Sequence, residues 1–174
     1  MVERPSNVAA MQGRKPPHGV QGLPATLPAT PISGRLLAAI SATADPHPDV
    51  GPPQGYDRDV QAEARRVLAI VEPFAAPVFE AAVRAWLAPV LGAVRNPQGD
   101  AAMTAWFPGL MLAVGQLEAG AFTIETQRAA LQTFDFFPSA ADVYRVVSGP
   151  AMVIRRRVQV LRRIVDAPTT KNGA

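Results

Sequence analysis

The sequence predicts an all-α protein, a small bundle of five to six helices that follows a disordered, proline-rich N-terminal arm. Apolar residues recur at helical spacing in successive stretches beyond Tyr56, and no segment there alternates apolar and polar residues as a half-buried strand would. Ten of the 18 prolines precede Tyr56, and a segment so rich in proline cannot build a packed core. Only 6% of the residues are aromatic, and a core of mainly Ala, Val and Leu suits closely packed helices.

These observations divide the 174 residues into three parts. Residues 1–55 form the disordered arm, residues 56–166 the helical domain, and residues 167–174 a frayed C-terminal tail. One apolar island, Ser33–Ile40, interrupts the arm and is long enough for two helical turns. Because isolated helices this short are marginal in water, the island is either a transient helix without a role or a motif that folds on a partner or docks back on the domain.

Three helices are expected in the first part of the domain. The first begins near Asp57, an acidic residue that caps the helix and meets its dipole favourably, and it ends at Pro73. The second opens near Pro77, and Asp100 caps the third. Internal prolines should kink or split the second helix and kink the third, and they are Pro89 and Pro108.

Three further helices are expected after residue 120. They span residues 123–133, 139–147 and 150–165. Ser139 and Asp142 have the spacing of a capping box at the start of the fifth helix. The run Ser148-Gly149-Pro150 should break the chain between the fifth and the sixth helix, because proline is tolerated at the first position of a helix but not in its interior.

Three phenylalanines lie within four residues between the fourth and the fifth helix, at Phe134, Phe136 and Phe137. Because Pro138 disfavours helical backbone at the residue before it, the chain must turn here. The cluster either fills the core of the bundle, as large apolar side chains mostly do, or forms an exposed knob that a partner grips. The two tryptophans fall on apolar helical stripes and are expected in the core, at Trp86 and Trp106.

The strongest electrostatic feature is the last predicted helix. Its apolar stripe consists of Ile154, Val158, Leu161 and Val165. Four arginines flank this stripe, at Arg155, Arg156, Arg162 and Arg163. The net charge is only +3, but the pI is about 9.9 and much of the positive charge lies at one end of the chain. The arginines are either the solvated outer face of a core helix or contacts to an acidic protein surface or to phosphates.

The residue inventory argues against catalysis and against a bound cofactor or metal. The chain has no cysteine, and its two histidines, His18 and His47, lie in the arm, so the domain lacks the usual metal ligands and bases. Most carboxylates of the domain stand at predicted helix starts, where capping accounts for them, and no glycine-rich phosphate loop is present. We therefore predict a protein that is not an enzyme and that binds no cofactor.

The hydropathy pattern gives no sign of a membrane segment. No run of 18 apolar residues is present, and the first residues lack the apolar stretch of a signal peptide. We expect no membrane span and a cytoplasmic location, with which the absence of cysteine agrees.

Two neighbouring segments, Gln127–Phe134 and Phe136–Val143, resemble a pattern of phage-type replicative helicase loader and inhibitor proteins. The pattern is a helix that carries Ala-Leu before an aromatic residue, followed by Phe-Phe-Pro-Ser and a second helix. The resemblance extends over residues 106–147 and implies a small, all-helical protein that binds a hexameric replicative helicase. No ATPase module is present, which excludes the loaders that hydrolyse ATP.

The fourth helix, the turn and the fifth helix also have the proportions of a helix-turn-helix motif. Its recognition helix would span residues 139–147 and would offer Tyr144 and Arg145 to bases or phosphates. Specific reading of DNA usually takes more polar side chains than these two.

We therefore predict a non-enzymatic accessory protein of phage or prophage replication that binds a replicative helicase. The alternative is a DNA-binding module, such as a phage packaging or regulatory protein, that uses the basic C-terminal helix. A third hypothesis is a structural or scaffolding component. The candidate partner-binding residues are Phe136, Phe137, Tyr144, Arg145, Arg155, Arg156, Arg162 and Arg163.

Overall fold

The computed structural model describes residues 30–46 and 53–170, and these residues form an all-α protein, which confirms the predicted fold class. Its α-helices are α1 (Gly34–Ala44), α2 (Arg58–Val71), α3 (Glu80–Ala93), α4 (Asp100–Val114), α5 (Ile124–Thr133) and α6 (Ala140–Asp166). Two short 3-10 helices are η2 (Glu72–Ala75) and η3 (Ala119–Ala121). The backbone of the described ranges forms isolated bridges but no strand.

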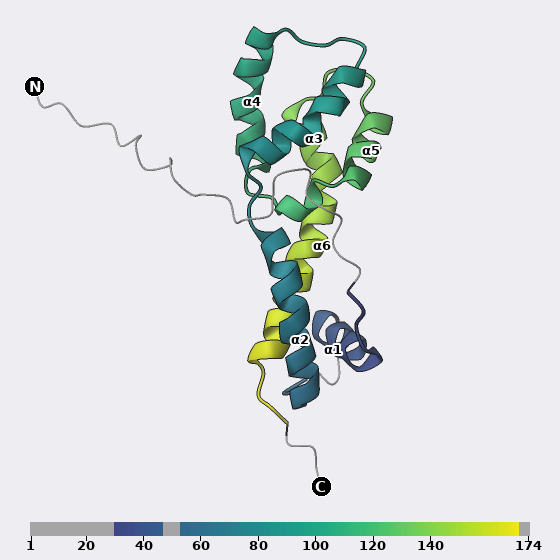
Figure 1. Ribbon diagram of the computed structural model, residues 1–174, viewed down its shortest axis with the longest axis vertical. Helices are drawn as coiled ribbons and strands as arrows, with labels where there is room; N and C mark the ends of the chain where they lie inside the picture. Colours follow the sequence, from purple (N-terminus) through teal and green to yellow (C-terminus); the bar gives the residue numbers. More distant parts are fainter. Residues whose placement is uncertain (1–29, 47–52, 171–174) are drawn as a thin grey trace, which may run out of the picture.

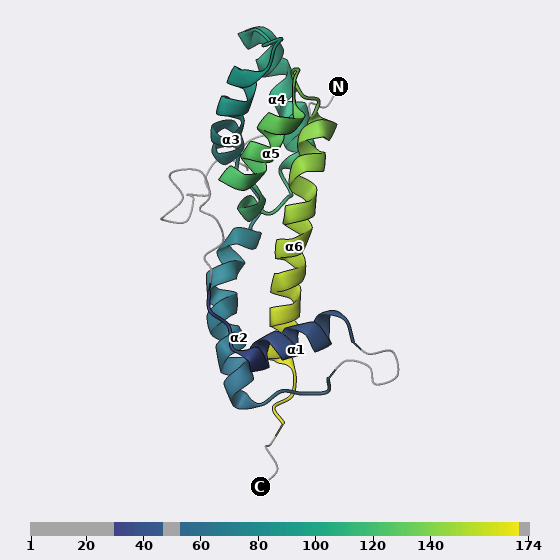
Figure 2. The same ribbon diagram turned by 90° about the vertical axis from the view of Figure 1, so that its right-hand side faces the viewer.

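The protein is elongated, and α6 runs along most of its length (Figure 1). Helices α3, α4 and α5 surround the N-terminal half of α6, whereas α1 and α2 lie against its C-terminal half (Figure 2). Two separate clusters of buried side chains correspond to these two parts. We call them the upper region and the lower region, and α6 contributes to both.

The core of the upper region is built around aromatic side chains. Trp86 on α3 is fully buried and meets Phe122 edge to face, with ring centroids 5.7 Å apart. The indole Nε1 of Trp86 donates to the backbone oxygen of Thr123 at 3.1 Å and to Oγ1 of Thr126 at 3.2 Å. In return, Nε2 of Gln127 donates to the backbone oxygen of Trp86 at 2.8 Å. These buried hydrogen bonds satisfy the polar groups and fix how α3 meets α5.

The core of the lower region has only aliphatic side chains among its fully buried members. Helix α2 supplies Val67 and Val71, and α6 supplies Leu161 and Ile164, all at most 2% exposed. Helix α1 lies across α6 and buries Leu36 completely (Figure 2). Aliphatic contacts therefore join three helices in the lower region, and Nε2 of the buried Gln61 adds a hydrogen bond of 2.7 Å to the backbone oxygen of Ala167.

Polar contacts also attach α1 to the rest of the lower region. The backbone N–H and the hydroxyl of Ser33, the N-cap of α1, donate to the two carboxylate oxygens of Glu63 at 2.7 and 2.5 Å. The side-chain hydrogen bond first, and the backbone one second, hold the pKa of Glu63 below its usual range. At the other end of α1, the hydroxyls of Thr43 and Tyr56 are hydrogen-bonded to each other.

The apolar island of the sequence therefore docks back on the domain, which was one of its two predicted interpretations. The boundary predicted between residues 55 and 56 needs correction for this segment, because Leu36 and Ala39 bury enough apolar surface to hold a helix that is marginal alone. The remainder of the predicted arm, residues 1–29 and 47–52, lies outside the described residues.

The fifth and the sixth predicted helices are a single helix. Helix α6 has 27 residues and continues without a break through Pro150, so the predicted break was wrong. An internal proline costs about 3 kcal/mol through its lost hydrogen bond and its steric clash. The neighbouring Val147, Ala151 and Ile154 are at most 2% exposed, and their burial offsets that cost. Two other helices contain a proline without splitting, with Pro89 in α3 and Pro108 in α4.

The segment after α6 pairs with the segment before α2. The backbone N–H of Tyr56 donates to the oxygen of Pro168 at 3.1 Å, and the N–H of Thr170 donates to the oxygen of Tyr56 at 3.0 Å. The predicted frayed tail is therefore corrected for residues 167–170, whose backbone is tied to the domain. Residues 171–174 lie outside the described part of the chain.

Candidate functional site

The predicted aromatic cluster divides between the core and the surface. Phe137 is half-buried and packs edge to face on Trp106, with ring centroids 4.8 Å apart. Phe134 packs against the upper core, whereas Phe136 is 64% exposed. Each of the two interpretations thus applies to part of the cluster. Trp106 itself is only half-buried, so it stands at the edge of the core, unlike the fully buried Trp86.

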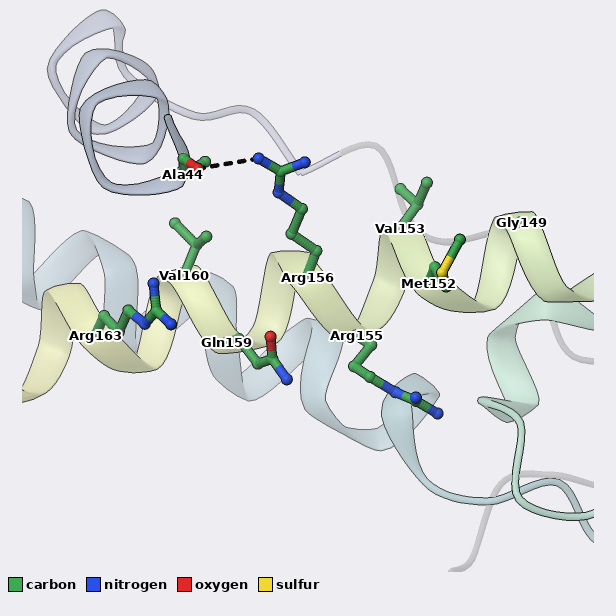
Figure 3. A pocket seen from close by; sticks show the side chains of 9 residues that line it. All are labelled: Ala44, Gly149, Met152, Val153, Arg155, Arg156, Gln159, Val160 and Arg163. Atoms are coloured by element: carbon green, nitrogen blue, oxygen red, sulfur yellow. Dashed lines mark hydrogen bonds between the residues drawn. The ribbon is translucent and has the colours of Figure 1, made fainter. Parts of the chain in front are cut away.

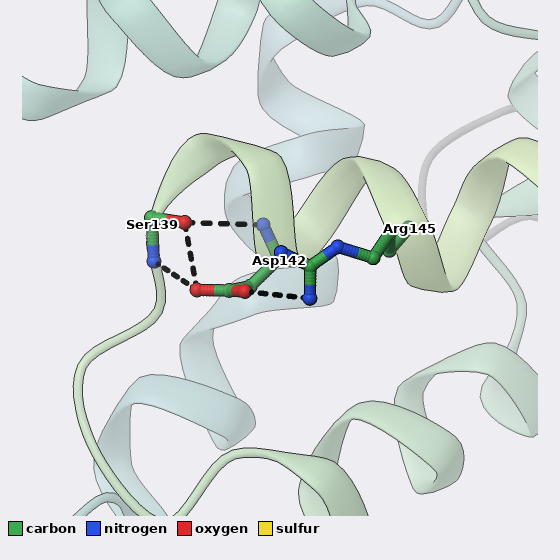
Figure 4. A network of polar contacts seen from close by, with 3 residues as sticks. All are labelled: Ser139, Asp142 and Arg145. Carbon is green, nitrogen blue, oxygen red and sulfur yellow. Dashed lines mark hydrogen bonds and ion pairs between the residues drawn. The ribbon is translucent and has the colours of Figure 1, made fainter.

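The start of α6 forms the predicted capping box (Figure 4). The backbone N–H and hydroxyl of Ser139 donate to Oδ2 of Asp142 at 2.9 and 2.7 Å, and the N–H of Asp142 donates to the Ser139 hydroxyl oxygen at 3.2 Å. Arg145 adds an ion pair of 3.0 Å to the other carboxylate oxygen. The Ser139 side chain first, then its N–H and Arg145, hold the pKa of Asp142 below its usual range.

This arrangement separates two groups of predicted site residues. Tyr144 is 44% exposed near the start of α6, beside an arginine that is engaged by the cap. Arg155, the first of the four arginines, comes ten residues after Arg145 and therefore lies about 15 Å further along the helix axis. The aromatic cluster with Arg145 is therefore separate from Arg156, Arg162 and Arg163, whereas Tyr144 lies close enough to Arg155 to contribute, after Glu118, to the raised pKa of Arg155.

Arg155 connects α6 to Glu118, which directly precedes η3 at the place where the upper and the lower region join. Its Nε donates to Oε1 of Glu118 at 2.5 Å, and the Glu118 side chain is only 6% exposed. This hydrogen bond and the charge of Glu118 raise the pKa of Arg155. The second carboxylate oxygen of Glu118 is buried without a hydrogen-bond partner, so the guanidinium of Arg155 is the main compensation for that buried charge.

Two further arginines hold other elements against α6. Nη2 of Arg156 donates to the backbone oxygen of Ala44 at 3.0 Å, where α1 ends, and Nη2 of Arg162 pairs with Oε1 of Glu72 at 2.5 Å, just after α2. Arg163 is exposed and forms neither an ion pair nor a hydrogen bond with its side chain within the described residues. The four arginines are thus divided into three that attach neighbouring elements and one that faces solvent freely.

A groove lies between the C-terminal end of α1 and the outer side of α6 (Figure 3). Its larger hollow has a volume of about 530 Å³, and a second hollow of about 390 Å³ adjoins it. The two hollows share Ala44, Val153, Arg156 and Val160. Figure 3 shows Val153, Arg156 and Val160 projecting from α6 on the side where α1 lies.

The floor of the groove is apolar and the rim is basic. Met152, Val153 and Leu37 line it and are 65%, 67% and 54% exposed, which is unusual for three large apolar side chains in one place. The basic residues that line either hollow are Arg155, Arg156, Arg157 and Arg163. Among the described residues, no carboxylate, hydroxyl or imidazole lines the two hollows.

Sequence reasoning identified Arg155, Arg156 and Arg163 of this groove but missed Arg157 and the floor. Met152 and Val153 lie off the stripe of Ile154, Val158 and Leu161, and apolar residues off the buried stripe were the available signal. The contribution of Leu37 could not be recognised, because it depends on where α1 docks.

Comparisons with protein-family models, with curated proteins and with solved structures found no match. In the part of the chain that the structure describes, no helix is both long and apolar enough to cross a membrane. The same part holds no group of three or more His, Asp or Glu side chains that could bind a metal ion.

Proposed function

We propose that the protein is a non-enzymatic accessory protein that binds a protein partner through the groove between α1 and α6. The observation that supports this most is the exposure of Leu37, Met152 and Val153 within a rim of arginines. Interfaces between proteins combine a central apolar patch with a polar rim and are enriched in arginine and methionine. The resemblance of residues 106–147 supports the replicative helicase of a phage or prophage as that partner.

The chemistry of the groove supports binding rather than catalysis. General acid–base and nucleophilic catalysis need a titratable or nucleophilic side chain within reach of the substrate. The two hollows offer guanidinium groups, one amide at Gln159 and apolar side chains. Guanidinium groups stay protonated and bind carboxylates well, which is the chemistry of recognition.

Binding of DNA is the second candidate function, and one observation favours it. Arg156 and Arg163 are seven residues apart on α6, so they lie on the same side of the helix, and neither forms an ion pair within the described residues. Against it, Arg155 and Arg162 are paired with carboxylates inside the fold, which leaves fewer cations for phosphates. The apolar floor also gains nothing from contact with a phosphate backbone.

A binding experiment at several salt concentrations tests both functions. We expect a purified hexameric replicative helicase to bind the full chain, with affinity that falls only moderately as salt rises because apolar contacts carry much of it. Random duplex DNA should bind weakly. A DNA binder loses affinity steeply as salt rises, with a slope of log affinity against log salt of about −0.9 for each phosphate that it neutralises. If random duplex DNA binds tightly with such a steep slope, the DNA-binding function replaces the proposed one. Binding of neither would refute both.

A further inference from the structure

We infer that the groove between α1 and α6 receives an acidic amphipathic helix of the partner protein. This inference rests on the proposed function, because it names the occupant of the same site. It is drawn from the apolar floor, the uncompensated charges on the rim and the length of α6 that is open to the occupant.

The floor requires apolar side chains from the occupant. Each hollow exceeds by more than tenfold the volume of about 30 Å³ that one water molecule takes up in the liquid, so each accepts a branched or aromatic side chain. Val153 and Val160 line both hollows, and Leu37 and Met152 each line one. An occupant with apolar anchors would remove the exposed side chains of Val153, Met152 and Leu37 from water, which is the main driving force for association, and would pack on Val160, which is already buried.

The rim requires negative charge from the occupant. Arg157 and Arg163 make no ion pair or hydrogen bond within the described residues, and Arg156 donates to a neutral carbonyl. Three positive charges therefore face the groove without a carboxylate, whereas the charge of Arg155 is balanced by Glu118. Carboxylates beside the apolar anchors would form charge-assisted hydrogen bonds with these guanidinium groups.

The shape favours a helix over an extended peptide. The groove runs along α6 from Gly149 to Arg163, a separation of 14 residues and about 21 Å, which matches a helix of about four turns. An extended peptide that binds by strand addition would need an open strand edge, and the described residues contain no strand. A polyproline II peptide docks in an aromatic-lined groove, and no described residue that lines either hollow is aromatic. At Gly149 an added Cβ would meet nothing within 4 Å, so this end of the groove is open.

A designed peptide of about 16 residues tests the inference, because its length matches the groove. The probe places Leu at helical spacing on one side and Glu on both flanks, and fluorescence anisotropy measures its binding to the full chain. We expect binding that weakens about tenfold or more when Lys replaces every Glu, and similarly when Gln replaces every Leu. Random duplex DNA and anionic lipid vesicles serve as probes of the two other classes of partner.

Matched variants of the protein locate the binding site. Val153→Gln and Met152→Gln should each weaken peptide binding about tenfold, since they place a polar group on the floor. Leu112→Gln is the control, because Leu112 on α4 is 88% exposed and lies outside the groove. Circular dichroism of all three variants shows that the fold is kept, since none of these side chains is buried.

The result that overturns the inference is equal binding of the Glu and Lys peptides, no binding of either, or peptide binding that Val153→Gln and Met152→Gln leave unchanged. Tighter binding of DNA or vesicles than of the acidic peptide would also overturn it.

The helicase experiment has outcomes that can be distinguished from those of the peptide experiment. Helicase binding without peptide binding refutes the helical occupant and leaves the proposed function standing, whereas peptide binding without helicase binding keeps the inference and refutes the helicase as partner.

Discussion

The upper and the lower region of the molecule share one helix, yet they are held together differently. The upper core contains Trp86 and Phe122 and encloses a hydrogen bond from the Trp86 indole to Thr126 and one from the Gln127 amide to the backbone oxygen of Trp86. The lower core is aliphatic, and its polar attachments lie partly at the surface, as between Ser33 and Glu63, and partly buried, as where Nε2 of Gln61 donates to the backbone oxygen of Ala167 at 2.7 Å. In the upper region, the buried bonds of Trp86 specify one packing of α3 against α5. The lower region leaves apolar groups of α1 and α6 exposed, and the groove occurs there.

The largest effect is expected in the upper core. Trp86→Ala should lower the free energy of unfolding by about 3–5 kcal/mol, because it leaves a cavity and removes the donor that faces Thr126. Urea denaturation measures this. Phe136→Ala is the control, since an exposed ring should change stability by no more than about 0.5 kcal/mol. Equal effects of the two substitutions would show that the aromatic core is not what holds the upper region.

A smaller and more local effect is expected in the lower region. Leu36→Ala should cost about 2–3 kcal/mol, because it removes the fully buried anchor of α1. Hydrogen exchange should then become faster in α1, while α3 and α5 keep their protection. Leu37→Ala, which changes a neighbour that is 54% exposed, should leave the exchange of α1 nearly unchanged. If α3 and α5 also lost their protection, the upper core would depend on the docking of α1, contrary to the prediction.

Replacing an arginine of α6 by glutamine should affect stability differently at Arg155 and at Arg163. Arg155→Gln leaves the buried carboxylate of Glu118 without its cation and should lower the melting temperature clearly. Arg163→Gln removes an arginine that has no partner in the described residues and should change stability by no more than about 0.5 kcal/mol. Thermal melting compares the two. In the double variant, Glu118→Gln should restore part of the loss caused by Arg155→Gln.

Sequence reasoning succeeded where the cause of a structure is local. The helix caps at Asp57 and Ser139 were predicted correctly, because a cap depends on a few adjacent residues. The cap predicted at Asp100 was wrong, because Gly99 holds the N-cap position of α4 and Asp100 is the first residue of the helix. The break at Pro150 was wrong, because burial of residues on both sides of a proline is a tertiary effect. Local signals alone could not decide whether the island around Leu36 docks.

The candidate site shows the same limit. The helical period placed the four arginines outside the buried stripe, but it could not assign their contacts. Arg155 and Arg162 pair with residues 37 and 90 positions away, and Arg156 reaches a backbone oxygen 112 positions away. Such distant partners are set by the packing of whole helices, so their identity cannot be inferred from spacing along one helix.

The smallest effect concerns the attachment of α1 at low pH. The pKa of Glu63 is lowered in the folded protein by its hydrogen bonds to Ser33, so the unfolded chain binds the proton more readily. The resulting stabilisation is fully present above the pKa of the unfolded state and is lost as the pH falls through the lowered pKa. We expect exchange in α1 to become faster in this acidic range, and Glu63→Gln to remove that dependence. If the variant keeps the acid sensitivity of α1, the contact between Ser33 and Glu63 does not cause it.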